Sequence, residues 1–292
     1  MKPFILLNPE KIFEKLFIEA CKTRQIVYRI TKTTNIIIDI HTNHIDFYDN
    51  GSPLCFDDAG YIFIRKKGKE ILGEFATIIC EYIDFKKIPY NDQVNLHDTT
   101  NKGKAAQMTI FGSAGLPVPH SIVCDQRGYI PHKKTILSLI QFPCVLKTRG
   151  AKGENVWKIN NESELTKKIE SLAGAILIQE YIPNNYDVRV LVFEDMCIGA
   201  IKRTSIDGFY NNVSKGATTE PIEITDHEKN ISIRAAQAYN IDFGGVDFIR
   251  TPTGPQLLEV NKSPQIKGFF AATQIDVPAI LIDSITKRYL SK

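Results

Sequence analysis

Near the C-terminal end, two apolar runs flank a short segment of threonine, proline and glycine. The runs cover residues 245–250 (GVDFIR) and 257–261 (LLEVN), which predicts two strands joined by a turn. If the two strands pair about Thr253, Asp247 lies opposite Glu259. The sequence therefore predicts a hairpin that brings two carboxylates together.

The side chains of this hairpin point to a cation. Alternation along a strand places Asn261 on the same face as Glu259. Like charges directly across a ladder are destabilising, so Asp247 and Glu259 call for a positive partner. All three side chains offer hard oxygen atoms, which suit Mg²⁺. A solvated hairpin with its polar face in water is the alternative.

The first hundred residues open with a strand and a helix. Residues 4–7 form an apolar run, and Asn8-Pro9-Glu10 predicts a helix capped by Asn8, with the proline in its first turn. A β/α unit favours a small Rossmann-like domain, although no GxGxxG is present for a dinucleotide. We interpret His41 and His44 as surface or turn residues, because no further metal ligands are evident nearby. Further strands are expected at residues 26–30, 36–40, 45–48 and 61–65, and a helix at 69–85.

A polar stretch over residues 91–103 indicates a linker into a second domain. A helix over 104–114, closed by Gly115, follows it. Next come a strand over 119–124 and another that ends at Lys147. The remaining expected elements are a capped helix over 161–172, a strand over 175–182 that ends in QEYI, a hairpin turning at Glu194-Asp195, a polar loop over 206–221, a helix over 225–239 with a Thr225/Glu228 capping box, and a closing helix over 277–290.

After Lys147 the chain enters a polar loop that contains Gly150 and Gly153, and a return strand follows. Glycines let backbone amides approach oxyanions closely, so this segment predicts a phosphate-covering hairpin. It is not a P-loop, because GxxxxGK[ST] is absent.

Composition narrows the class of protein. The chain has 292 residues, 43% hydrophobic and 24% charged, which is ordinary for a globular protein with two or three small domains. Its net charge of +3 is too small to argue for nucleic acid. No apolar run reaches the length of a membrane span, and the apolar start is too short for a secretion signal. The six cysteines are scattered, so reduced thiols and a cytoplasmic location are expected.

Five features occur in one order along the chain. They are Lys104 at the head of a helix, Lys147 with its glycines, QEYI, the hairpin from Asp187 to Arg203, and the set Asp247, Glu259 and Asn261. Together they resemble the ATP-grasp ligases, in the branch typified by the RimK-like ribosomal-protein glutamate ligases. The resemblance covers residues 101 to the end, and the first hundred residues are consistent with it in fold only.

The resemblance implies an α/β (α+β) ATP-grasp fold with three subdomains and ATP in the cleft between the last two. They are a Rossmann-like domain at residues 1–98, a small central domain at 99–175 and a C-terminal domain at 176–292. It implies that two Mg²⁺ ions, or Mn²⁺, are held by Asp247, Glu259 and Asn261. It also implies that Arg203 lies near the transferred phosphate, with Arg189 assisting on the same face. The implied nucleotide contacts are Lys104, Lys147, Gly150, Gly153, Gln179, Glu180, Tyr181, Ile182, Asp187, Asn211 and Asn212.

The implied activity is ATP-dependent ligation of a carboxylate to an amine through an acyl phosphate. Four lysines are expected around the site, which favours an anionic amino acid, peptide or protein as substrate: Lys202, Lys215, Lys262 and Lys267. No nucleic-acid or membrane partner is expected, and a homo-oligomer is left open. Two alternatives stand: a ligase that cross-links or cyclises a precursor peptide, and a non-catalytic ATP-binding protein. Gln265 stands where the family commonly has glycine, a departure that bears on acceptor selectivity.

Overall fold

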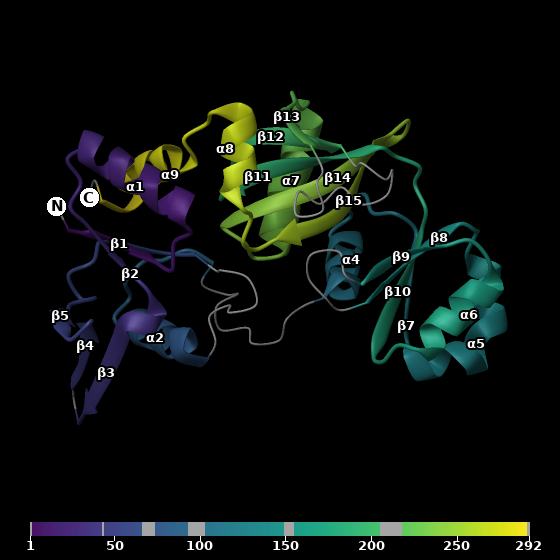
Figure 1. The fold of residues 1–292 in the computed structure, drawn as a ribbon, viewed down its shortest axis with the longest axis horizontal. Coiled ribbons are helices and arrows are strands. Elements are labelled where there is room, and N and C mark those ends of the chain that lie inside the picture. The colour runs from purple at the N-terminus through teal and green to yellow at the C-terminus, as the bar shows by residue number, and fades with distance from the viewer. Residues whose placement is uncertain are drawn as a thin grey trace. The chain divides into compact units, whose positions relative to one another are not determined.

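The computed structural model describes residues 2–42, 44–65, 74–92, 103–148, 155–204 and 218–290. The chain forms two compact units, which are drawn in Figure 1. The first contains Met1–Thr99, Asn240–Gly244 and Lys262–Lys292, and the second contains Thr100–Tyr239 and Gly245–Asn261. The structure thus groups the last residues of the chain with its beginning, while the division into three subdomains stays a prediction.

The first unit is built on a parallel sheet in the order β2-β1-β6. Every residue of β1 and β6 is buried, as expected for strands covered on both faces. This sheet confirms the strand–helix opening predicted from the sequence. The elements are β1 (Phe4–Leu7), α1 (Lys11–Thr23), β2 (Tyr28–Thr31), a 3₁₀ turn η1 (Thr33–Asn35), β6 (Tyr61–Ile64) and α2 (Glu74–Phe85).

The predicted start of α1 is wrong. The helix begins at Lys11 with Glu10 in the cap position, two residues after Asn8. Asn8 instead adopts a left-handed backbone conformation, with φ of 54°. Its side-chain Oδ1 accepts hydrogen bonds from the backbone N–H and the hydroxyl of Thr33, at 2.9 and 3.2 Å. Asparagine tolerates this conformation, so the chain turns at Asn8 before the helix starts.

A second, antiparallel sheet of the first unit has the order β3-β4-β5. One face carries the buried side chains of Ile36, Phe47 and Leu54. The opposite face of β3 and β4 carries exposed polar side chains together with Ile37, which is 60% exposed. The strands are β3 (Ile36–His41), β4 (His44–Asp49) and β5 (Ser52–Leu54), and the first two confirm the expected positions.

Two C-terminal helices complete the first unit: α8 (Ile266–Thr273), which the sequence pattern missed, and α9 (Val277–Ile285), which runs into the π-helical turn η3 (Thr286–Leu290). Val277, Leu281 and Ile285 are buried along one face of α9, as their spacing predicts. Among the described residues no single helix has the length and apolar character to cross a membrane. The helices Ile266–Thr273 and Val277–Leu290 meet that criterion only as a pair, bent by 104°.

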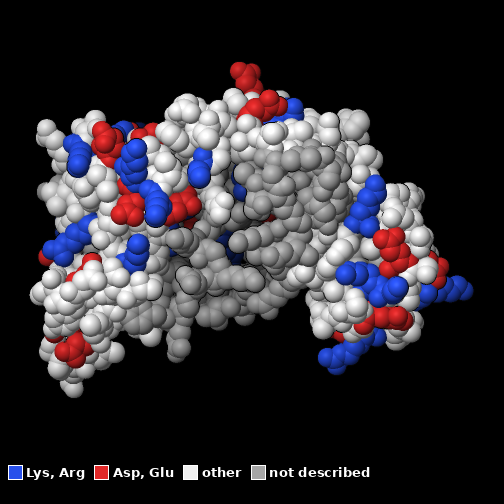
Figure 2. All heavy atoms as spheres, viewed as in Figure 1, with Lys and Arg blue, Asp and Glu red and all other residues white. Residues whose placement is uncertain are grey.

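The second unit contains a four-stranded antiparallel sheet in the order β7-β10-β8-β9. One face packs against α5 and α6 around Tyr129, Leu146 and Ile178. The sequence pattern missed α5, because Gly128 and Pro131 interrupt its apolar periodicity. Figure 2 shows basic and acidic side chains interspersed over the region of these two helices. The elements are β7 (Ser121–Asp125), α5 (Gln126–Leu139), β8 (Cys144–Thr148), β9 (Val156–Ile159), α6 (Glu162–Glu170) and β10 (Ala175–Glu180).

A five-stranded sheet of the second unit has the order β13-β12-β11-β14-β15. The hairpin of β11 and β12 turns at Glu194, which has φ of 51°, as predicted. The predicted capping box of α7 is confirmed, because Thr225 and Glu228 satisfy each other's backbone N–H groups. The elements are α4 (Lys104–Ser113), β11 (Tyr186–Phe193), β12 (Met196–Thr204), β13 (Thr218–Pro221), α7 (Asp226–Ala238), β14 (Phe243–Thr251) and β15 (Gly254–Asn261).

Candidate active site

The hairpin of β14 and β15 has the register that the sequence predicts. Asp247 pairs with Glu259, and Gly245 pairs with Asn261. The register shifts between Asp247 and Phe248, a local irregularity that adjoins the first carboxylate. Asp247 is buried, whereas Glu259 and Asn261 are partly exposed. One member of the predicted metal set therefore lies inside the protein and two lie at its surface.

Asp247 belongs to a buried ion-pair cluster with Arg189, Arg203 and Asp187. Arg189 donates from Nε to Oδ1 of Asp247 at 2.7 Å and from Nη2 to Oδ2 at 2.6 Å. Arg203 donates from Nη2 to Oδ2 of Asp247 at 2.8 Å, and from Nε and Nη2 to the two oxygens of Asp187 at 2.6 Å each. The cluster spans β11, β12 and β14, and its two positive and two negative charges balance.

The cluster shows how burial and pairing compete. Burial alone would raise the pKa of Asp247, but the Arg189 and Arg203 guanidiniums outweigh it and hold that pKa below its ordinary value. Burial raises the pKa of Asp187 to about 6, against the opposing effect of Arg203. Paired and hydrogen-bonded charges are the form in which proteins tolerate ionised groups in their interior.

The oxygen donors fit a divalent cation. A carboxylate has about four lone-pair positions, and Asp247 uses three of them for guanidinium N–H groups. Oδ1 of Asp247 thus keeps one acceptor position, while Glu259 and Asn261 supply a carboxylate and an amide oxygen from β15. This all-oxygen set matches the preference of Mg²⁺, with the two arginines fixing the orientation of the buried carboxylate.

The second predicted lysine, Lys147, lies on the face of the four-stranded sheet opposite to α5 and α6. Its Nζ donates to Oε1 of Gln179 at 2.6 Å. Burial lowers the pKa of Lys147 to about 8; nearby Glu259 raises it and nearby Lys104 lowers it further. The structure therefore brings Lys104, Lys147 and Glu259 within electrostatic reach of one another.

Gln179, predicted as a nucleotide contact, is 3% exposed and engaged inside the protein. Its Nε2 donates to Oγ of Ser121 at 2.9 Å and to the sulfur of Met108 at 3.3 Å. Its oxygen holds Lys147, so Gln179 positions that lysine. Neither Ser121 nor Met108 stood out in the sequence, because each lies in an unremarkable local pattern.

The remaining QEYI residues lie at the end of β10. Glu180 is exposed, and its Oε1 accepts a hydrogen bond from the backbone N–H of His120 at 2.9 Å. The ring of Tyr181 lies 4.0 Å from Nζ of Lys158. Adenine contacts by Glu180, Tyr181 and Ile182 stay a prediction, as does a ribose contact by Asp187, whose oxygens accept from Arg203.

Gln107 is a positioning residue that the sequence reasoning missed. From α4 its Oε1 accepts from the backbone N–H of Val260 at 2.7 Å, and its Nε2 donates to the carbonyl of Val260 at 3.2 Å. Val260 lies between Glu259 and Asn261, so this contact ties α4 to the hairpin of β14 and β15. The sequence held one signal for this role, because Gln107 is a single amide within the apolar pattern of α4. In the structure it is 8% exposed.

For several predicted residues the described part of the chain gives no place at this site. Gly150, Gly153, Asn211 and Asn212 lie outside the described residues, as does Lys215. Lys202 lies on the opposite face of β12 from Arg203, because neighbours along a strand face opposite ways, and its Nζ pairs with Glu220 at 2.7 Å. It therefore does not join the ion-pair cluster, and its place around the site stays a prediction. Lys262 and Lys267 belong to the first unit, and their place around the site stays a prediction.

Comparison with known families decides the class. The sequence profile of the RimK-like ATP-grasp domain matches residues 99–285. The chain belongs to the RimK-like ATP-grasp family. Curated relatives of this RimK-like protein include a probable alpha-L-glutamate ligase of Vibrio cholerae, 27% identical over all of this chain and 97% of the relative. A probable alpha-L-glutamate ligase 2 of Shewanella baltica is also 27% identical, over 96% of this chain and 93% of the relative.

Solved structures share the fold of this RimK-like protein. The ATP-grasp ligase PsnB, complexed with precursor peptide PsnA2 and AMPPNP, has a TM-score of 0.72 at 20% identity and covers 98% of this chain and 96% of its own. The macrocyclase MdnB of Microcystis aeruginosa has a TM-score of 0.71 at 15% identity over 98% and 99% of the two chains. The predicted ATP-grasp fold and the predicted class, an ATP-dependent ligase that forms amide bonds, are confirmed.

Proposed function

We propose that this RimK-like ligase joins the amino group of one amino acid or peptide to the carboxylate of another, with glutamate as one substrate. The carboxylate oxygen attacks the γ-phosphorus of ATP, an O–P bond forms, and ADP leaves. The amine then attacks the acyl carbon, a C–N bond forms, the C–O bond to phosphate breaks, and the amine proton passes to solvent. Phosphorylation is needed because a free carboxylate is a poor acylating agent.

The observation that carries this proposal is the arrangement of charge around β14 and β15. Arg203 is a fixed cation beside Asp247, and a positive group held in place can offset charge that develops on a transferred phosphoryl group. Glu259 and Lys104 both lie close enough to Lys147 to affect its pKa, and the amines of the two lysines suit phosphate oxygens. Glu259, Asn261 and Asp247 would hold magnesium, which would supply positive charge to the ATP phosphates.

The nature of the substrates rests on the relatives. Glutamate ligases align with the full length of this chain, which favours glutamate as a substrate. PsnB and MdnC are solved with precursor peptides, which favours a peptide as the other substrate. We extend the proposal to a second metal ion, to Mn²⁺ as a substitute, to a cytoplasmic location and to a homo-oligomer.

The test is a screen for ADP release with purified protein, Mg²⁺ and ATP against single amino acids and short acidic peptides. We expect ADP with glutamate plus one acceptor, and a product heavier than the acceptor by one glutamyl residue. The matched control is Glu259→Gln, which keeps the size of the side chain and removes a charged ligand. No ADP from any pair in the screen overturns the proposal.

The same screen separates the second candidate, a ligase that closes a bond within one peptide. One observation favours this second candidate: MdnB shares the fold and is a macrocyclase. A peptide that loses one water for each bond formed, with ADP release and without added amino acid, identifies that activity. Saturable ATP binding without ADP from either kind of substrate identifies a non-catalytic nucleotide-binding protein.

A further inference from the structure

A second group of charged side chains lies on the hairpin of β3 and β4 in the first unit. Its sequence, DIHTNHID over residues 39–46, reads the same by residue type from both ends except at its centre. In the structure His41 pairs with His44 across the strands, and Asp39 pairs with Asp46. Strand alternation places all four side chains on one face, opposite to the buried Ile36 and Phe47.

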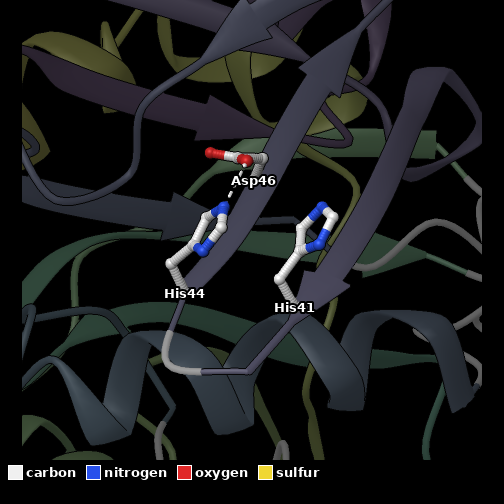
Figure 3. A group of neighbouring side chains, drawn as sticks. All are labelled: His41, His44 and Asp46. Atoms are coloured by element: carbon white, nitrogen blue, oxygen red, sulfur yellow. Dashed lines mark ion pairs between the residues drawn. The ribbon is translucent and has the colours of Figure 1, made fainter.

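This group places three possible metal-ligand atoms close together. His41, His44 and Asp46 each offer one ligand atom, and these atoms all lie within 4.8 Å of one another. The two imidazole rings are stacked, with centroids 4.7 Å apart and planes inclined by 7°. Figure 3 shows both rings projecting to the same side of adjacent strands, with Asp46 beside His44.

We propose that His41, His44 and Asp46 bind one divalent transition-metal ion of the zinc type. Imidazole nitrogens suit zinc, whereas magnesium takes oxygen ligands, so this site differs in chemistry from the oxygen set around Asp247. Two histidines and one carboxylate are a protein ligand set that leaves the fourth tetrahedral position of zinc to water.

The fourth side chain completes the arrangement. Oδ2 of Asp39 lies 3.1 Å from Nε2 of His41, so a carboxylate adjoins the first ring. Metal-bound imidazoles commonly donate their other N–H to a carboxylate in this way, which fixes the ring orientation. Oδ2 of Asp46 lies 3.2 Å from Nε2 of His44, so the carboxylate ligand already adjoins the second ring.

Exposure lets the ligands close on an ion. Zinc needs its ligand atoms about 2.0–2.2 Å from the metal, closer together than they lie in the structure. The four side chains are 49–60% exposed, so rotation about side-chain bonds brings the ligand atoms together without movement of the strands. An ion bound here ties β3 to β4 beside their connecting turn and protects the end of the hairpin.

The test uses the full-length protein without a histidine tag, and it is independent of ligase activity. Zinc binding is measured by isothermal titration in excess Mg²⁺, which occupies the oxygen set around Asp247. Cobalt binding is followed by the visible absorption of the tetrahedral ion. The variant is His41→Ala with His44→Ala, and circular dichroism checks that it folds.

Two matched controls address other ligands. His132→Ala with His227→Ala removes two exposed histidines from helices of the second unit. Cys55→Ser removes the exposed thiol of the first unit, because thiols are a group that zinc commonly binds. We expect both controls to bind zinc as the unchanged protein does.

We expect one zinc ion per chain, at least about tenfold weaker binding in Asp46→Asn, and loss of binding in the double histidine variant. Three results overturn the proposal: no saturable zinc binding in the micromolar range, unchanged binding in the double histidine variant, or one ion shared by two chains.

Discussion

Two groups of charged side chains in this protein share a construction and differ in burial. Each group places acids and bases on adjacent strands of one sheet: the ion-pair cluster of Asp187, Arg189, Arg203 and Asp247, and the hairpin group of Asp39, His41, His44 and Asp46. Side chains of the first are 3–12% exposed, whereas those of the second are 49–60% exposed.

Burial therefore decides what each group can do. In the ion-pair cluster every charge has a bidentate or doubly bonded partner, because an unpaired charge away from water is too costly to keep. The cluster is therefore fixed, with the carboxylate of Asp247 held in one orientation by two arginines. In the hairpin group water competes with each pair, so these side chains can exchange a neighbour for an ion.

The largest expected effect comes from Arg203→Met. The change leaves Asp187 buried without its guanidinium, so we expect the free energy of unfolding in urea to fall by about 3–5 kcal/mol. The double variant with Asp187→Asn should recover part of this loss, because it removes the unpaired charge. Lys202→Met, one residue away on the opposite face, serves as the control and should change stability by less than about 1 kcal/mol. Equal losses from Arg203→Met and Lys202→Met contradict the contrast in burial.

The second effect concerns chemistry at the edge of the ion-pair cluster. Glu259→Gln keeps the shape of the side chain and weakens metal binding, so ADP release should fall on the order of 100-fold. Unfolding should change little, because Glu259 is partly exposed. Glu220→Gln, an exposed acid on the same sheet, is the control and should keep full activity. Full activity of the Glu259→Gln variant would show that this carboxylate is not a metal ligand of the active site.

The third effect is a pH dependence of nucleotide affinity. The pKa of Lys147 is lowered to about 8, and an anionic phosphate binds the charged form. Affinity for a non-hydrolysable ATP analogue should therefore hold below pH 8 and fall above it by up to about tenfold per pH unit. Titrations between pH 7 and 9.5 measure this slope. Lys147→Met should bind weakly and lose the slope; the same slope in that variant assigns the titration to another group.

The smallest effect is expected in the hairpin group without metal. Asp39→Asn and His41→Ala remove one partner of an exposed pair, and such pairs contribute about 0.5 kcal/mol or less. Urea unfolding in the presence of a chelator should therefore match that of the unchanged protein. A loss above about 1 kcal/mol in either variant means that the pair itself stabilises the hairpin, as the buried pairs do.

Local patterns predicted much of the fold. The Thr225/Glu228 capping box, the turn at Glu194 and the closure of α4 by Gly115 were all readable, because each depends on residues within one turn of each other. The pairing of Asp247 with Glu259 was readable for the same reason, since a short turn sets the register of a hairpin. Helix α5 escaped because its glycine and proline contradict helix propensity, which tertiary packing overrides around Tyr129.

Sequence alone determined which residue types stand at each strand and helix end, and so the family and the donor atoms available for ATP and metal. Only the tertiary structure decided which donors are committed to partners. The pairing of Asp187 with Arg203, the hold of Gln179 on Lys147 and the contact of Gln107 with Val260 join residues from separate elements. Burial, which gives these contacts their strength, arises only when the elements pack together, and no local pattern records it.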